Sequence, residues 1–114
     1  MEEKHKNSMN KSDEAARIAK FAKALGHPTR VSIMHFLAEH ENCYFFDIHD
    51  ALPIAKATVS QHLKELKNAG LILGEIEPPK VKYTINSEAW DEMRVLFADL
   101  FDMCGCKKSN CHCN

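Results

Sequence analysis

The apolar residues in the middle of the chain change their spacing once, and this change restricts the fold more than any other feature. Val59, Leu63 and Leu66 lie four and three residues apart, which predicts a helix over about residues 56–69. Gly70 follows as its C-terminal stop, because glycine tolerates the backbone conformation that ends a helix. Beyond Gly70 the spacing falls to two residues, which is the period of a strand. A helix that leads directly into strands indicates a mixed α and β chain.

Two strands are predicted after this helix, over residues 71–77 and 80–86. In the second, apolar side chains alternate with polar neighbours at Val81, Tyr83 and Ile85. Pro78 and Pro79 lie between the two strands and favour a short, stiff connection. The segment therefore predicts a two-stranded β-hairpin.

Helical spacing also marks the segments on both sides of this unit. Further helices are predicted over residues 12–25, 28–40, 45–52 and 87–103. Pro28 suits a first helical turn, and Ser87 is predicted to cap the last helix. A length of 114 residues fits one small domain.

The predicted fold class is α+β, mostly α: a winged helix-turn-helix with five helices and a two-stranded β-hairpin wing. It occupies residues 12–103. Residues 1–11 are polar, charged and aperiodic, and we expect them to be disordered. Residues 104–114 form a cysteine-rich tail without apolar residues. The absence of an export signal and of a long apolar run predicts a cytoplasmic protein with no membrane partner.

The exposed face of the helix over 56–69 carries side chains that suit DNA. Amide, imidazole and hydroxyl groups can bond base edges, and lysine can neutralise phosphate. Between residues 53 and 83 five lysines accompany three glutamates, whereas residues 87–103 hold five acidic side chains and one arginine. The predicted DNA-binding residues are Lys56, Thr58, Ser60, Gln61, His62, Lys64, Lys80 and Lys82. On composition alone, a solvated helix face would explain these residues equally well.

Four sequence motifs favour DNA binding over that alternative. They are ALGHPTR from Ala24, DIHDAL from Asp47, TVSQHLKELKNAGL from Thr58 and VKYTIN from Val81. In this order, over roughly residues 15–100, they resemble the ArsR-type family of winged-helix repressors. The resemblance implies a homodimer that binds double-stranded operator DNA with dyad symmetry and releases it when an inducer binds. It does not suggest an enzyme, and no nucleophile with a paired base is evident.

The resemblance also implies that the first and last helices contribute to the dimer. The predicted interface residues are Ile18, Phe21, Trp90, Met93, Phe97 and Phe101, although some of these could belong to the core of one protomer. One departure from the family pattern lies before the DNA-reading helix, where Pro53-Ile-Ala55 replaces a serine cap. Loss of a serine cap costs roughly 0.5–2 kcal/mol of helix stability.

The tail holds four of the five cysteines, as two Cys-x-Cys pairs separated by four residues. Gly105 allows the turn that would bring the thiols together, and Lys107 and Lys108 favour thiolates. The predicted metal ligands are Cys104, Cys106, Cys111 and Cys113. An all-sulfur set selects soft ions such as Zn(II), Cd(II) or Cu(I). His112 is expected to be solvated.

Resemblance to repressors with cysteines just beyond the last helix points to trivalent arsenic or antimony as the inducer. The family's other common arsenic or cadmium site uses two cysteines before the DNA-reading helix, where this chain has only Cys43. We therefore expect Cys43 to be a half-buried structural thiol. Two alternatives stay open at this point. The thiols could form a redox switch on the same DNA-binding module, or the chain could be a thiolate metal-buffering protein.

Overall fold

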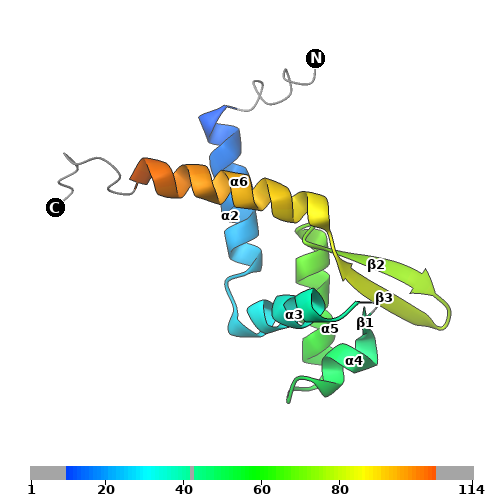
Figure 1. Cartoon of the computed structure of the whole chain (residues 1–114). Coiled ribbons are helices and arrows are strands. Elements are labelled where there is room, and N and C mark those ends of the chain that lie inside the picture. The colour runs from blue at the N-terminus through cyan, green and yellow to red at the C-terminus, as the bar shows by residue number, and fades with distance from the viewer. Residues whose placement is uncertain (1–9, 42, 105–114) are drawn as a thin grey trace.

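A computed structural model describes residues 10–41 and 43–104 of the chain (Figure 1). The helices are α2 (Lys11–Ala24), α3 (Pro28–Glu39), α4 (Phe45–Asp50), α5 (Lys56–Asn68) and α6 (Ser87–Cys104), and the strands are β1 (Cys43–Tyr44), β2 (Ile72–Glu77) and β3 (Lys80–Ile85). The predicted fold class is confirmed: in the described part of the chain, five helices accompany a small antiparallel sheet in a winged helix-turn-helix arrangement. Among the described residues, no helix is long and apolar enough to cross a membrane.

The sheet has three strands rather than the predicted two. Its order is β1-β3-β2, and both neighbouring pairs are antiparallel. Cys43 pairs with Tyr83 and Tyr44 with Lys82, so the wing is attached through β1 to the segment just before α4. A two-residue strand is too short for an alternating pattern, which explains why the sequence did not reveal it.

The helix starts depend on specific side-chain caps. Asn10 accepts a hydrogen bond from the backbone N–H of Asp13, so α2 begins one residue earlier than predicted. At the start of α6 the cap is Asn86 and not the predicted Ser87. The Oδ1 atom of Asn86 accepts from the N–H of Ala89 at 3.4 Å, and its Nδ2 donates to the carbonyl of Gly70 at 2.9 Å. Asn86 therefore joins the end of the wing to the end of α5.

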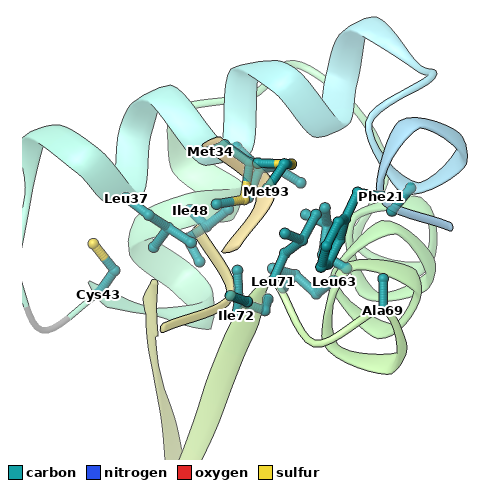
Figure 2. Packing of buried hydrophobic residues seen from close by; sticks show 14 of the residues in the cluster. Phe21, Met34, Leu37, Cys43, Ile48, Leu63, Ala69, Leu71, Ile72 and Met93 are labelled. Atoms are coloured by element: carbon teal, nitrogen blue, oxygen red, sulfur yellow. The ribbon is translucent and has the colours of Figure 1, made fainter. Parts of the chain in front are cut away.

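One hydrophobic core receives side chains from each of the helices α2 to α6. Phe21 of α2, Ile33 of α3, Ile48 of α4 and Leu63 of α5 are each at most 2% exposed, and Met93 brings α6 into the same cluster. Figure 2 shows Met93 close to Met34, with Leu71 and Ile72 below them at the start of β2. The core thus lies where the helix-turn-helix meets the root of the wing.

Helices α2 and α6 cross one another on the side of the molecule away from α4 (Figure 1). Arg17 of α2 donates from two guanidinium nitrogens to the two carboxylate oxygens of Glu92 on α6. The same guanidinium lies 5.2 Å from the ring centroid of Phe21. A bidentate arginine–carboxylate pair fixes orientation as well as distance, so the crossing of the two helices is well defined.

Candidate nucleic-acid interface

Helix α5 packs against the rest of the protein through one stripe of apolar side chains. Val59, Leu63 and Leu66 are at most 2% exposed, and they face α3, α4 and the start of the wing. Leu71 donates its N–H to the carbonyl of Leu66, and Gly70 has a φ of +83°. This is the Schellman arrangement, which ends a helix sharply. The predicted C-terminal stop is confirmed, and it directs the chain straight into β2.

His62 was predicted to contact DNA, but in this structure it packs in the interior of the protomer. Its side chain faces inward and is 7% exposed. The Nδ1 atom accepts a hydrogen bond from Nε of Arg30 at 3.1 Å, and the ring lies 4.4 Å from that of His27. Burial lowers the pKa of His62, and the neighbouring His27 and Arg30 lower it further. A neutral imidazole is the form that can accept this hydrogen bond.

The remaining predicted residues of α5 lie on its exposed side. We call this surface the reader face, and it comprises Lys56, Thr58, Ser60, Gln61 and Lys64. The Nζ atom of Lys56 lies 5.2 Å from the ring centroid of Phe46, which is itself 57% exposed on α4. Gln61 donates to Glu65 at 3.1 Å. Ala55 precedes the helix without a side-chain cap, as the sequence predicted.

The two predicted lysines of the wing lie in different surroundings. Lys82 forms ion pairs with Glu75 at 3.4 Å and with Glu77 at 3.2 Å, and these carboxylates raise its pKa. Lys80 is exposed, and its Nζ lies 4.9 Å from the ring centroid of Tyr44. A lysine that already neutralises two carboxylates has less attraction left for phosphate. Lys80 is therefore the better placed of the two to meet DNA.

A tyrosine that the sequence did not single out fixes the wing. The hydroxyl of Tyr44 donates to Glu77 at 2.7 Å, and this hydrogen bond, with the contacts from Lys82, lowers the pKa of Glu77. The backbone N–H of Tyr44 also donates to Asp47 at 2.9 Å, at the start of α4. Tyr44 thus connects the first helix of the helix-turn-helix to the far end of β2.

The predicted metal ligands fall mostly outside the described residues. Cys104 is exposed in the last turn of α6, whereas Cys106, Cys111 and Cys113 lie beyond the described part of the chain. Within residues 10–41 and 43–104, no three His, Cys, Asp or Glu side chains gather closely enough to hold a metal ion. Any thiolate site that includes Cys104 would need ligands from the tail or from another chain.

Cys43 is more deeply buried than the half-buried thiol that we expected. It is 2% exposed, and its Sγ donates to the carbonyl of His40 at 3.3 Å. Burial raises the pKa of this thiol, and Asp47 raises it further. A thiol held in its protonated form is a poor metal ligand and a poor nucleophile. Its structural role agrees with the prediction.

The predicted dimer residues divide into two groups. Phe21 is 1% and Met93 is 6% exposed, so both pack in the core of one protomer. Ile18, Trp90 and Phe97 are half-buried, and Phe101 is 63% exposed. A groove of about 310 Å³ runs between α2 and α6, and apolar side chains including Ile18, Leu100 and Met103 line it.

Several known proteins resemble part of this chain. The model of the family described as "Bacterial regulatory protein, arsR family" matches residues 27–73. The HTH-type transcriptional repressor SmtB of Mycobacterium tuberculosis is 40% identical over 63 residues, which cover 55% of this chain and 46% of the relative. The chain thus spans less than half the length of that repressor.

Two further relatives extend the comparison. An uncharacterized HTH-type transcriptional regulator of Methanocaldococcus jannaschii, MJ1325, is 41% identical over 64 residues, 56% of this chain and 68% of the relative. A Staphylococcus aureus homologue of the cadmium resistance transcriptional regulatory protein CadC is 34% identical over 71 residues, 62% of this chain and 59% of the relative.

A solved structure matches a larger part of the chain than these relatives do. The homodimeric winged helix-turn-helix DNA-binding domain of Mb0332 from Mycobacterium bovis, described as a possible ArsR-family transcriptional regulator, is 27% identical. The match has a TM-score of 0.58 and covers 80% of this chain and 79% of that one. The matching family model, the identity to MJ1325 and the shared winged-helix fold lead to one conclusion. This chain belongs to the ArsR family of winged helix-turn-helix transcriptional regulators.

Proposed function

We propose that this protein is a homodimeric repressor whose reader face enters the major groove of an operator with dyad symmetry. The observation that carries this proposal is the reader face itself. Polar and cationic side chains occupy one exposed side of α5 while the opposite side is buried, and the wing lies beside it. Helix-turn-helix proteins use the second helix of the motif in this way.

The side chains of the reader face suit different tasks on DNA. Gln61 is the residue suited to bidentate bonding of adenine, and Ser60 and Thr58 can bond either bases or phosphates. Lys56 and Lys64 can neutralise phosphates, as can Lys80 in the wing. His62 has no place in this set because it supports α5 from within.

The proposed dimer uses the exposed apolar surface of α2 and α6. Phe97 and Phe101 make an edge-to-face pair with centroids 5.9 Å apart, in the C-terminal half of α6. Exposed apolar surface of this kind is typical of a protein–protein interface. The Mycobacterium bovis domain of the same fold is described as homodimeric, which supports pairing of two copies here.

The proposed inducer is a thiophilic ion, with arsenite or antimonite as the first candidates. Cys104 presents an exposed thiol at the end of α6, and Cys106, Cys111 and Cys113 follow within nine residues. Three thiolates suit trivalent arsenic, and four suit zinc or cadmium. The Staphylococcus aureus relative is described as a cadmium resistance regulator, so cadmium belongs in any comparison of inducers.

The proposed coupling runs through α6. Gathering the tail thiols around an ion releases protons and holds the tail against the last turn of α6. Because the same helix contributes to the proposed dimer interface, a change at Cys104 alters how two copies pack and how far apart their reader faces lie. Coupling free energies of about 1–3 kcal/mol are typical of such linkage.

The DNA-binding part of the proposal is tested by selecting a duplex from a random pool with the reduced protein. The expected result is a sequence with dyad symmetry, and Gln61→Ala should lose preference at one base position in each half-site. A protein that enriches no sequence, or that binds selected and random duplexes equally, would contradict the proposal.

The inducer part is tested separately on the selected operator. Arsenite, antimonite, Cd(II), Zn(II) and Cu(I) are titrated into the complex, and each tail cysteine is replaced by serine in turn. Release by arsenite that two or more replacements abolish supports the proposal. Release by hydrogen peroxide alone indicates a redox switch, and ion binding without any effect on DNA indicates metal buffering.

A further inference from the structure

A cationic hollow lies beside the reader face, and the sequence analysis predicted no function for the side chains that line it. It has a volume of about 410 Å³ and lies between the end of α2, the start of α3 and the C-terminal half of α5. Its polar lining consists of Lys20, Lys23, Arg30, Glu65 and Asn68. Three cations and one carboxylate give the hollow a net positive charge.

Arg30 is held firmly in this lining. Its Nε donates to Nδ1 of His62 at 3.1 Å, and one terminal nitrogen donates to the carbonyl of Ala24 at 3.2 Å. A guanidinium has five N–H groups, so these two bonds leave others available. Neither partner is charged, because His62 acts as a neutral acceptor. The positive charge of Arg30 is therefore positioned but not neutralised by these two bonds.

The hollow holds one carboxylate, that of Glu65, against three cations. Glu65 accepts a hydrogen bond from Gln61 at 3.1 Å along the surface of α5. Lys20 and Lys23 are both exposed and lie one turn apart at the end of α2, where their ammonium groups repel each other. Two like charges beside a fixed guanidinium favour an anion between them.

The hollow and the wing flank α5 on opposite sides. Lys67 points toward the wing, where its Nζ lies 3.4 Å from the position that a Cβ on Gly74 would take. Glu65 and Asn68 lie on the other side of the same helix and line the hollow. A helix that enters a major groove has one phosphate backbone on each side of it.

We propose that this hollow binds backbone phosphates of the DNA on the side of α5 opposite the wing, through Lys20, Lys23 and Arg30. The inference rests on the proposed DNA-binding function and adds a second, sequence-independent contact to it. Its contribution is positioning: it fixes the angle at which the reader face enters the groove, whatever the base sequence is.

The test compares the full-length reduced protein with the double variant Lys20→Gln/Lys23→Gln on the selected operator and on a random duplex. Dissociation constants are measured at several salt concentrations. Removal of each lysine–phosphate ion pair should flatten the slope of log K against log salt by about 0.9. The decrease in affinity should be equal on both duplexes. Both lysines are exposed at the end of α2, so the variant should unfold at the same temperature as the wild type.

Two controls sharpen this comparison. Lys20→Arg/Lys23→Arg keeps the charges and should keep the wild-type slope. Arg94→Gln removes one exposed charge from α6, away from the hollow, and should also leave the slope unchanged. A double glutamine variant with the wild-type slope and affinity overturns the inference while the proposed function stands. A wild-type protein that binds neither duplex overturns both.

Discussion

His62 has the side chain of a DNA-contacting residue, yet it is buried against the core. Burial, with His27 and Arg30 nearby, lowers the pKa of His62 below its ordinary value of 6.5. Just below pH 6.5 the imidazole of His62 is therefore protonated to a greater extent in the unfolded chain than in the folded chain. We expect the free energy of unfolding to fall as the pH drops from 7 to 5, by at most about 1.4 kcal/mol per pH unit for this one proton.

Urea unfolding at several pH values, on the wild type and on His62→Gln, measures this effect. Glutamine can still accept from Arg30 but does not titrate, so the variant should lose stability less steeply toward low pH. The other histidines contribute to both proteins alike. Parallel curves for the two proteins would show that protonation of His62 does not matter to folding.

Cys43 and Cys104 should differ in reactivity because only one of them is accessible. The thiol of Cys43 is 2% exposed with a raised pKa, whereas Cys104 is exposed. Thiolates are the nucleophiles in alkylation, so iodoacetamide should label Cys43 more slowly than Cys104 by about tenfold or more. Peptide mass spectrometry gives both rates, and labelling in guanidinium chloride should remove the difference. Equal rates in the folded protein would contradict the burial of Cys43.

At the scale of elements, the junction between α5 and β2 depends on Gly70. Its φ of +83° lies in the left-handed region, and no atom beyond its two chain neighbours lies within 4 Å of an added Cβ. Gly70→Ala should therefore lower the free energy of unfolding by about 1–2 kcal/mol, because alanine adopts this backbone conformation less readily than glycine. Gly70→Asn should cost less, because asparagine adopts this conformation more readily. Chemical denaturation compares the two variants, and an alanine variant as stable as the wild type would contradict the assignment.

Tyr44 of β1 attaches the wing to the start of α4, through its contacts with Glu77 and Asp47. Tyr44→Phe removes the 2.7 Å hydrogen bond to Glu77 while keeping the ring against Lys80. We expect faster hydrogen exchange of the amides near the wing tip, with little change in global stability. Tyr83→Phe, on the neighbouring strand β3, is the matched control and should leave the exchange of those amides unchanged. Equal exchange in both variants would place the attachment of the wing elsewhere.

The sequence predicted elements better than it predicted the partners of single side chains. Helix α5 was placed correctly because Val59, Leu63 and Leu66 repeat at helical spacing. His62 completes this i, i+3, i+4, i+7 set, so the signal for its burial was present, although its polar character suggested a DNA contact. No pattern could separate Phe21 from Phe101, because a core face and an interface face are equally apolar in sequence. Only the packing of the folded chain distinguishes them, with Phe21 in the core and Phe101 exposed.

At the scale of the whole molecule, the proposed sites lie along one connected path. The reader face and the cationic hollow share α5, which His62 joins to Arg30 and α3. Asn86 joins the end of α5 to the start of α6, and Glu92 joins α6 to α2. Hydrogen bonds therefore connect α6 to both α2 and the end of α5. This path is the physical basis for the proposed coupling between the tail and DNA.

The final prediction concerns assembly. Phe101 is 63% exposed on α6 and pairs only edge-to-face with Phe97 among the described aromatic rings. Phe101→Asp places a charge on the proposed dimer face, where burial without a partner is costly. We expect sedimentation equilibrium to show a monomer with an unchanged circular dichroism spectrum and a strongly reduced affinity for the two-half-site operator. Ile76→Asp, at a side chain that is 75% exposed in the wing, makes the same kind of change away from α6 and should remain dimeric. If Phe101→Asp stays dimeric and the wing variant dissociates, two copies pair through the wing and not through α6.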